Sequence, residues 1–333
     1  MRILELHDLR EFLSSPKKVV ITNHINPDGD AMGSALGLQH YLEKSGHQVS
    51  VVIPNDPADF LKWLPGAEST VSADYHTAQA ERLFSEAEVV FCLDYNAIGR
   101  AGELIAPMIE SSEARKVLID HHREPESWPD DMYSDIAKGS TCEMIYDLIE
   151  MWDGQADVGE AIATCLYVGI VTDSGSFRFP STKPSTHKAA AFLLERGARP
   201  ELIHERIYDV NTKSRMKLLG HLLDTMQFVE DRDIAILHLT KEVMNKVGYT
   251  KGDSEGFVNY GLSMKGMRMS VFFREDGDVC KCSFRSKGEL DVNHFARKYF
   301  NGGGHLNAAG GLFHGNAEEA ITAVREAIEK ENI

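Results

Sequence analysis

Carboxylates and imidazoles occur together in four short segments of this chain, spread over about 150 residues. The segments are 23–30 (NHINPDGD), 93–94 (LD), 120–122 (DHH) and 172–175 (TDSG). Each closes an apolar run of the kind that forms a buried strand, and the run 160–171 before Asp173 also has a helical pattern. Ligands bind at the carboxyl ends of the strands in open α/β sheets, so we expect the segments to share one site. Oxygen and imidazole ligands without cysteine suit Mn²⁺ or Mg²⁺ better than structural zinc, which points to hydrolysis of a phosphate ester.

The first segment has the spacing His24-x-x-x-Asp28-x-Asp30. In a tight loop these three side chains can converge, and the proline and glycine between them supply the bend. The predicted helix over 31–44 would then direct its first N–H groups towards a phosphate. An ordinary Asp/Asn/Gly turn is the alternative explanation of this segment taken alone.

The other segments are each ambiguous on their own. A single aspartate such as Asp94 at a strand end is common in turns and helix caps. The adjacent His121 and His122 would be explained by a metal ion and a nearby phosphate, or by an exposed pair on a loop. Ser174 and its glycine and serine neighbours suit a loop near phosphate. The four segments in this order together favour the metal site.

The pattern of elements predicts an α/β fold. Apolar runs typical of buried parallel strands lie at 18–22, 49–53, 88–93 and 116–119. Helical patterns between and after them, at 31–44, 140–152, 160–171 and 186–195, favour a doubly wound, mostly parallel sheet. Later strands are expected at 233–239, 267–274 and 279–284, and the last two flank a hairpin turn at 275–278. We therefore predict an amino-terminal domain over 1–195, a helical connector over 196–229 and a smaller α+β domain over 230–333.

Bulk composition excludes several classes of protein. The net charge of −16 argues against a protein that coats duplex DNA, because that function needs a basic surface. No apolar stretch is long enough to cross a membrane, and the amino-terminal residues carry charges where a signal peptide would be apolar. Five cysteines, an odd number without a CxxC pair, fit a reducing cytosol. We expect a cytoplasmic protein, and the sequence is compatible with a homodimer.

The chain resembles the DHH phosphoesterase superfamily, whose name spells Asp120-His121-His122. The other three segments resemble further motifs of that family, and 282–286 (CSFRS) and 301–305 (NGGGH) resemble its DHH-associated domain. Length and layout are most similar to the bacterial oligoribonucleotidases (nanoRNases) that also dephosphorylate adenosine 3′,5′-bisphosphate. Tyr95 and Asn96 depart from the small polar residues that are commoner after this aspartate, and we expect them to alter the pocket wall.

The resemblance implies a two-metal centre with Mn²⁺, or alternatively Mg²⁺. One cation would be held by His24, Asp28 and Asp94, and the other by Asp30, Asp94, His121 and Asp173. Two cations about 3.5–4 Å apart can share a water, lower its pKa and clamp the phosphoryl oxygens. The bridging Asp94 and the neighbouring His122 would then be the catalytic residues, with His122 either binding phosphate or protonating the leaving group.

The resemblance also assigns substrate binding to the second domain, through Arg285, Ser286, Gly303, Gly304 and His305. Glycines allow close backbone approach and an anion-binding row of N–H groups, and an arginine fork can grip phosphate. A glycine-rich hairpin bend and a surface arginine are the alternative explanations. A cleft closed at one end would favour short oligonucleotides.

Phe257 and Tyr260 could stack on a base, but we expect them to be packed in the core. We expect a two-metal phosphodiesterase that releases nucleoside monophosphates from short oligoribonucleotides and also acts on adenosine 3′,5′-bisphosphate. A phosphodiesterase of linear or cyclic signalling dinucleotides and a non-catalytic nucleotide-binding regulator are the alternatives. A protein that only stores cations would not need the second domain's nucleotide-binding pattern.

Overall fold

The computed structural model describes residues 7–333, apart from the side chains of His7, Glu230 and His305. Residues 1–6, part of the charged stretch that argues against a signal peptide, lie outside the described residues. The chain divides into two compact units, the first ending at Val210 and the second running from Asn211 to Ile333. Within residues 7–333, no helix combines the length and apolar character needed to cross a membrane.

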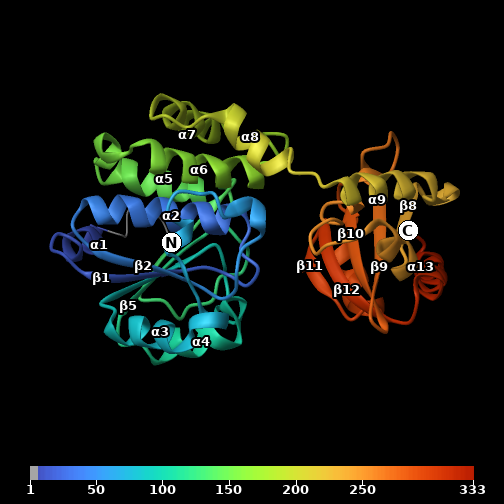
Figure 1. The fold of residues 1–333 in the computed structure, drawn as a ribbon, viewed down its shortest axis with the longest axis horizontal. Coiled ribbons are helices and arrows are strands. Elements are labelled where there is room, and N and C mark those ends of the chain that lie inside the picture. Colours follow the sequence, from blue (N-terminus) through green and yellow to red (C-terminus); the bar gives the residue numbers. More distant parts are fainter. Residues whose placement is uncertain (1–6) are drawn as a thin grey trace. The chain divides into compact units, whose positions relative to one another are not determined.

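The first unit is built on a parallel sheet of six strands (Figure 1). The strands are β1 (Lys18–Thr22), β2 (Gln48–Ile53), β3 (Val71–Ser72), β4 (Val89–Leu93), β5 (Arg115–Asp120) and β6 (Asp131–Ser134). Their order is β3-β2-β1-β4-β5-β6, and every neighbouring pair is parallel. This confirms the predicted doubly wound sheet. The chain reverses its direction of travel across the sheet between β1 and β4, which makes their carboxyl ends the topological switch point.

Helices cover both faces of this sheet (Figure 1). The helices are α1 (His7–Phe12), α2 (Gly29–Lys44), α3 (Ala73–Glu86), α4 (Gly102–Ser111), α5 (Thr141–Met151), α6 (Glu160–Asp173), α7 (Pro184–Glu195) and α8 (Pro200–Tyr208). Alternate strand residues serve the two faces: Ile21 packs in the core shared with α2, α5 and α6, whereas Val20 packs in the core shared with α3 and α4. Burial on both faces explains why the strands read as continuous apolar runs.

Glycines line the contact between helices α2 and α6 and allow the two backbones to approach closely. Gly29, Gly33 and Gly37 recur every fourth residue on α2 and therefore share one face. A Cβ atom on Gly33 would lie 2.4 Å from the carbonyl oxygen of Cys165 on α6. This close approach brings the first turn of α2 next to the last turn of α6, which ends at Asp173. The expectation that a strand delivers Asp173 is therefore wrong, since α6 delivers it.

Gly33→Ala is expected to destabilise the first unit by about 1–3 kcal/mol, because the added methyl group overpacks the interface between α2 and α6. Gly220→Ala is the matched control, since a Cβ atom there meets nothing within 4 Å. This substitution only lowers the conformational entropy of the unfolded chain, so it should not destabilise the fold. Scanning calorimetry of both variants measures the effect. An unchanged transition in Gly33→Ala would show that this helix contact is not tight.

The second unit holds a mixed sheet of six strands in the order β11-β12-β10-β9-β8-β7. Its strands are β7 (Gln227–Val229), β8 (Ile234–Leu239), β9 (Met269–Asp276), β10 (Val279–Ser286), β11 (Gly303–His305) and β12 (Ala308–His314). Only β8 and β9 pair in parallel. The β9–β10 hairpin turns at Gly277, whose φ is +66°, as the turn signal predicts. The smaller α+β domain is thereby confirmed as a fold class.

Five helices accompany this sheet: α9 (Lys213–Asp224), α10 (Lys241–Val247), α11 (Val258–Leu262), α12 (Val292–Tyr299) and α13 (Ala317–Glu331). One face packs Phe284 against α12 and α13, and the other packs Phe272 against α9, α10 and α11. Phe257 is fully buried in the latter core, as expected, whereas Tyr260 is 37% exposed.

The predicted connector over 196–229 is divided between the two units. Ile203 and Ile207 of α8 pack into the first core, and Leu218 and Leu222 of α9 pack into the second. The units therefore meet in sequence at Val210 and Asn211, and each unit includes one helix of the predicted connector. Each helix has its own apolar face, and the sequence does not say which core that face joins.

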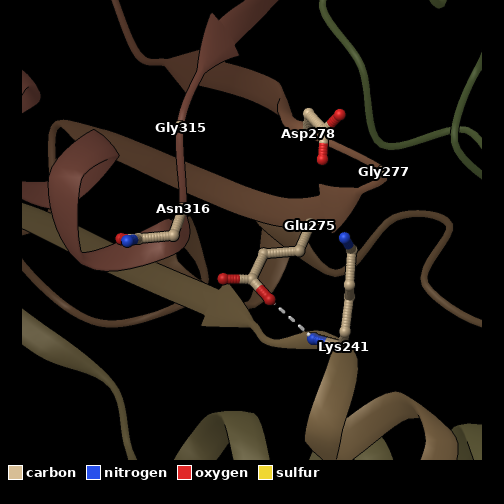
Figure 2. A pocket seen from close by; sticks show the side chains of 6 residues that line it. All are labelled: Lys241, Glu275, Gly277, Asp278, Gly315 and Asn316. Carbon is tan, nitrogen blue, oxygen red and sulfur yellow. Dashed lines mark hydrogen bonds between the residues drawn. The ribbon is translucent and has the colours of Figure 1, made fainter.

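A surface pocket of about 350 Å³ lies in the second unit (Figure 2). It is lined by Lys241, Glu275, Gly277, Asp278, Gly315 and Asn316. The Glu275 carboxylate accepts the backbone N–H groups of Lys241 at 2.7 Å and Ala317 at 3.0 Å, so it caps the starts of α10 and α13. None of the predicted site residues lines this pocket, which we interpret as structural.

Candidate functional site

Six predicted ligand residues converge at the switch point of the first sheet. His24 follows β1, Asp94 follows β4, and His121 follows β5. Helix α2 adds Asp28 at its N-cap and Asp30 in its first turn, and α6 adds Asp173 at its last position. Within the described residues, every group of three side chains that could hold a metal ion is drawn from these six residues and the adjacent His122.

The first group comprises His24, Asp28 and Asp94, whose ligand atoms all lie within 4.8 Å of one another. The Nε2 atom of His24 is 3.4 Å from Oδ2 of Asp94 and 3.9 Å from Oδ2 of Asp28. The other ring nitrogen, Nδ1, is 2.9 Å from the carbonyl oxygen of Ile25 and must donate to it, which directs Nε2 into the site. Oδ1 of Asp28 caps α2 by accepting the N–H groups of Asp30 and Ala31.

The second group comprises Asp30, His121 and Asp173, also within 4.8 Å of one another. The Nε2 atom of His121 lies 3.3 Å from Oδ2 of Asp173 and 3.8 Å from Oδ2 of Asp30. It also lies 3.5 Å from Oδ1 of Asp94. The two oxygens of Asp94 therefore face different groups, which is the arrangement that a bridging carboxylate requires.

The charges in this cluster are strongly coupled. Burial alone would lower the pKa of His121, but hydrogen bonds with Asp173 and Asp94 raise that pKa to about 12. Burial would raise the pKa of Asp94, yet hydrogen bonds from His121 and His24 hold it well below its usual range. Burial and the charges of Asp94 and Asp173 raise the pKa of Asp30. Protonated imidazoles thus offset the crowded carboxylates here, and divalent cations would offset them more fully while releasing those protons.

Asp94 is held in a constrained backbone conformation. Its φ is +66°, in the left-handed region that aspartate tolerates better than most residues, and it is 2% exposed. Its N–H group donates to the carbonyl oxygen of Ile119 at 3.1 Å. The end of β5 therefore fixes the start of the loop after β4, and the carboxylate is directed to the centre of the cluster.

His122 is oriented by Asp120, a residue that the sequence reasoning used only as part of the motif. Nδ1 of His122 lies 2.7 Å from Oδ1 of Asp120, and the His122 N–H group donates to Oδ2 at 3.1 Å. Asp120 is fully buried, and its carboxylate can only accept, so Nδ1 of His122 carries the proton that is donated to it. This bond fixes the orientation of the ring and leaves Nε2 as the other ring nitrogen. Nδ1 is also 3.8 Å from Oδ1 of Asp94. Asp94, His121 and His122 form a third group that could hold a metal ion, although the bond to Asp120 commits Nδ1 of His122. The signal for Asp120 in the sequence was its place at the end of an apolar run, two residues before the histidine.

The prediction that Tyr95 and Asn96 alter the pocket wall is not supported. Tyr95 is fully buried in the core on the α3 and α4 face of the sheet. The Asn96 side chain donates to the carbonyl oxygen of Arg123 at 2.6 Å and so fixes the loop after His122. Tyr95 lies beyond the end of β4 at Leu93 and follows the left-handed backbone of Asp94, so its adjacency to Asp94 does not place it at the site.

In the second unit, Arg285 and Ser286 lie at the end of β10. The half-buried Arg285 guanidinium donates to the carbonyl oxygen of Phe284 at 2.9 Å, and no acidic side chain in the described part of the unit pairs with it. Burial lowers the pKa of Arg285 from its ordinary value. Ser286 is occupied structurally, since its hydroxyl donates to the carbonyl oxygen of Leu290 at 2.6 Å and accepts from Asn307.

The glycine-rich segment forms the edge strand β11 and the hairpin to β12. Gly304 has a φ of +154°, and its N–H group donates to Oδ1 of Asn293 at 2.9 Å. The N–H group of Gly302 donates to the carbonyl oxygen of Ala296. The predicted row of free N–H groups is thus partly used within the fold. Gly303 pairs with Gly310, and the side chain of His305 lies outside the described residues.

Comparison with known proteins covers nearly the whole chain. Residues 18–170 match the family model described as DHH family, N-terminal domain, and residues 219–331 match the DHHA1 domain. The bifunctional oligoribonuclease and PAP phosphatase NrnA of Thermus thermophilus is 31% identical over 318 residues, which cover 94% of this chain and 90% of that protein. The cyclic-di-AMP phosphodiesterase GdpP of Geobacillus thermodenitrificans is 27% identical over 339 residues, covering 97% of this chain and 49% of that protein.

A solved structure is similar over the same extent. The crystal structure of an exopolyphosphatase-related protein from Bacteroides fragilis has a TM-score of 0.96 and 39% sequence identity, and the match covers 98% of this chain and 96% of that chain. The family models match parts of both units, and the solved structure shares the fold of this chain. The chain therefore belongs to the DHH family, with a DHHA1 domain after its DHH domain.

Proposed function

We propose that this protein is a two-metal phosphodiesterase that hydrolyses short oligoribonucleotides to nucleoside monophosphates and also dephosphorylates adenosine 3′,5′-bisphosphate (PAP). The observation that carries the proposal is the bridging position of Asp94, with one oxygen towards His24 and the other towards His121. The Thermus thermophilus NrnA, named for both activities, supports the choice of substrates. The free cysteines of the present chain fit a cytoplasmic enzyme.

The donor set fits two hard or borderline divalent cations, and we infer Mn²⁺ with Mg²⁺ as the alternative. We assign them to His24, Asp28 and Asp94 on one side, and to Asp30, Asp94, His121 and Asp173 on the other. When bound, such a pair lowers the pKa of a shared water and neutralises charge on the phosphoryl oxygens.

His122 would act on the substrate itself. The buried Asp120 fixes its ring orientation and tautomer, which favours a role for the imidazole in contacting a phosphoryl oxygen or in protonating the leaving ribose oxygen. Asp120 would act through His122 and so is a positioning residue. Preorganisation of this kind lowers the cost of ordering the site at the moment of reaction.

The second unit would bind the part of the substrate away from the cleaved bond. The guanidinium of Arg285 is half-buried and has no acidic partner among the described residues. Such a group suits bidentate recognition of phosphate. Gly303, Gly304 and His305 would contribute the neighbouring backbone and side-chain contacts, and Ser286 would support the loop that carries them.

The second candidate is hydrolysis of linear or cyclic signalling dinucleotides. The similarity to the cyclic-di-AMP phosphodiesterase GdpP, over 97% of this chain and 49% of that protein, supports the cyclic case. The two candidates are separated by offering the manganese-loaded protein a linear RNA dinucleotide, PAP and cyclic di-AMP in parallel. We expect the RNA dinucleotide and PAP to yield AMP. Turnover of cyclic di-AMP alone would favour the second candidate, and tight binding without any turnover would favour a non-catalytic regulator.

A further inference from the structure

The start of α5 reaches into the carboxylate cluster from a segment that the metal assignment does not use. Thr141, the first residue of α5, is fully buried. Its hydroxyl donates to Oδ1 of Asp94 at 3.1 Å, and its N–H group donates to Oδ2 of Asp30 at 2.6 Å. One residue thus contacts a carboxylate of each proposed ligand group.

The hydroxyl of Thr141 is not needed to cap its own helix. Ser140 performs that function, since its Oγ accepts the N–H group of Glu143 at 3.0 Å. A threonine at the first helical position can turn its hydroxyl to a local backbone acceptor. Here the hydroxyl is instead directed out of the helix to Asp94, which lies 47 residues earlier in the chain.

A substitution of the Thr141 side chain would remove its contact with Asp94 but not its backbone contact with Asp30. Asp30 accepts backbone N–H groups from Thr141 and Cys142, the latter at 2.8 Å, so its orientation depends on the helix backbone. Asp94 depends on the hydroxyl itself. The terminal torsion of an aspartate side chain varies over a broad range of angles, and a hydrogen bond from the Thr141 hydroxyl narrows that range for Asp94. The hydrogen bond still leaves an acceptor position on Oδ1 for a cation.

We propose that Thr141 is a positioning residue whose hydroxyl fixes the rotation of the Asp94 carboxylate, so that Oδ1 and Oδ2 each remain directed at one of the two cations. The inference rests on the proposed two-metal function and deepens it. Contacts that orient metal ligands in this way typically change metal affinity by about 10- to 100-fold when removed.

The test compares Thr141→Val, which keeps the shape but loses the hydroxyl, with Thr141→Ser, which keeps the hydroxyl. Mn²⁺ is titrated into each metal-free protein by calorimetry, and electron paramagnetic resonance reports the magnetic coupling of the cation pair. We expect Thr141→Val to bind at least one Mn²⁺ about 10- to 100-fold more weakly, with a weakened coupling signal. Thr141→Ser should retain both. Thr141→Ala gives the same readout if valine is not tolerated in the fold.

Thr186→Val is the matched control. Thr186 is also buried and also donates to a carboxylate, Oε2 of Glu143, at 2.8 Å, but that pair lies outside the cluster. This variant should lose stability and keep its Mn²⁺ affinity. Wild-type affinity and coupling in Thr141→Val would overturn the inference alone. A wild-type protein that binds fewer than two Mn²⁺ would overturn the proposed function, and the inference with it.

Discussion

Asp94→Ala is expected to lose at least one of the two cations and to lower turnover by several orders of magnitude. Both oxygens of Asp94 are used, with Oδ2 at 3.4 Å from Nε2 of His24 and Oδ1 at 3.5 Å from Nε2 of His121. Removing the carboxylate therefore affects both ligand groups, and the activated water depends on both cations. Turnover of an RNA dinucleotide and the metal content of the purified variant measure the two effects.

Asp131→Ala controls for the general cost of removing a buried aspartate from this sheet. Asp131 is 8% exposed and forms a two-bond ion pair with Arg115. Breaking this partly buried pair should cost some stability, but the pair lies outside the cluster, so both cations and turnover should persist. Near-normal turnover in Asp94→Ala, with two cations still bound, would contradict the two-metal assignment.

Arg285→Ala is expected to impair cleavage of an RNA dinucleotide by about 10- to 100-fold, which corresponds to the loss of a charge-assisted hydrogen bond of about 1.5–3 kcal/mol. A small artificial phosphodiester has no second phosphate to bind, so its hydrolysis should change much less. Steady-state kinetics on both substrates measures the difference, which we expect mainly in KM for the dinucleotide.

Arg274→Ala is the matched control on the adjacent strand β9. Its guanidinium is already engaged, with Nη1 donating to the Tyr249 hydroxyl at 2.9 Å and Nη2 lying 3.6 Å from Asp276. This variant should affect the two substrates alike. An equal loss on both substrates in Arg285→Ala would refute a role for Arg285 in binding a remote phosphate.

Much of the first unit could be predicted because its signals are local. The strands β1, β4 and β5 end within two residues of His24, Asp94 and His121, so strand pairing alone brings these residues together. The delivery of Asp173 was not local in this sense. It depends on the close contact between α2 and α6, which needs glycines such as Gly33. The sequence does not show which helix these glycines face, so their role is visible only in the folded structure.

The supporting residues were missed for the same reason. The contact between Thr141 and Asp30 joins residues 111 positions apart, and the sequence of neither segment predicts it. The expectation about Tyr95 was wrong because adjacency along a chain does not imply a shared face. In the second unit, the glycine pattern predicted close backbone approach, but the partner of Gly304 proved to be Asn293.

The most direct test of the account is cleavage of a 5′-labelled RNA ladder from two to about twenty nucleotides, with Mn²⁺ and with a chelator. We expect the shortest species to disappear first, because a substrate site that is closed beyond the remote phosphate accommodates only short chains. The chelator should abolish this loss, because the carboxylate cluster needs its cations. Chelator-resistant cleavage, or no cleavage at any length in protein that holds two Mn²⁺, would contradict the proposed two-metal hydrolysis of short oligoribonucleotides.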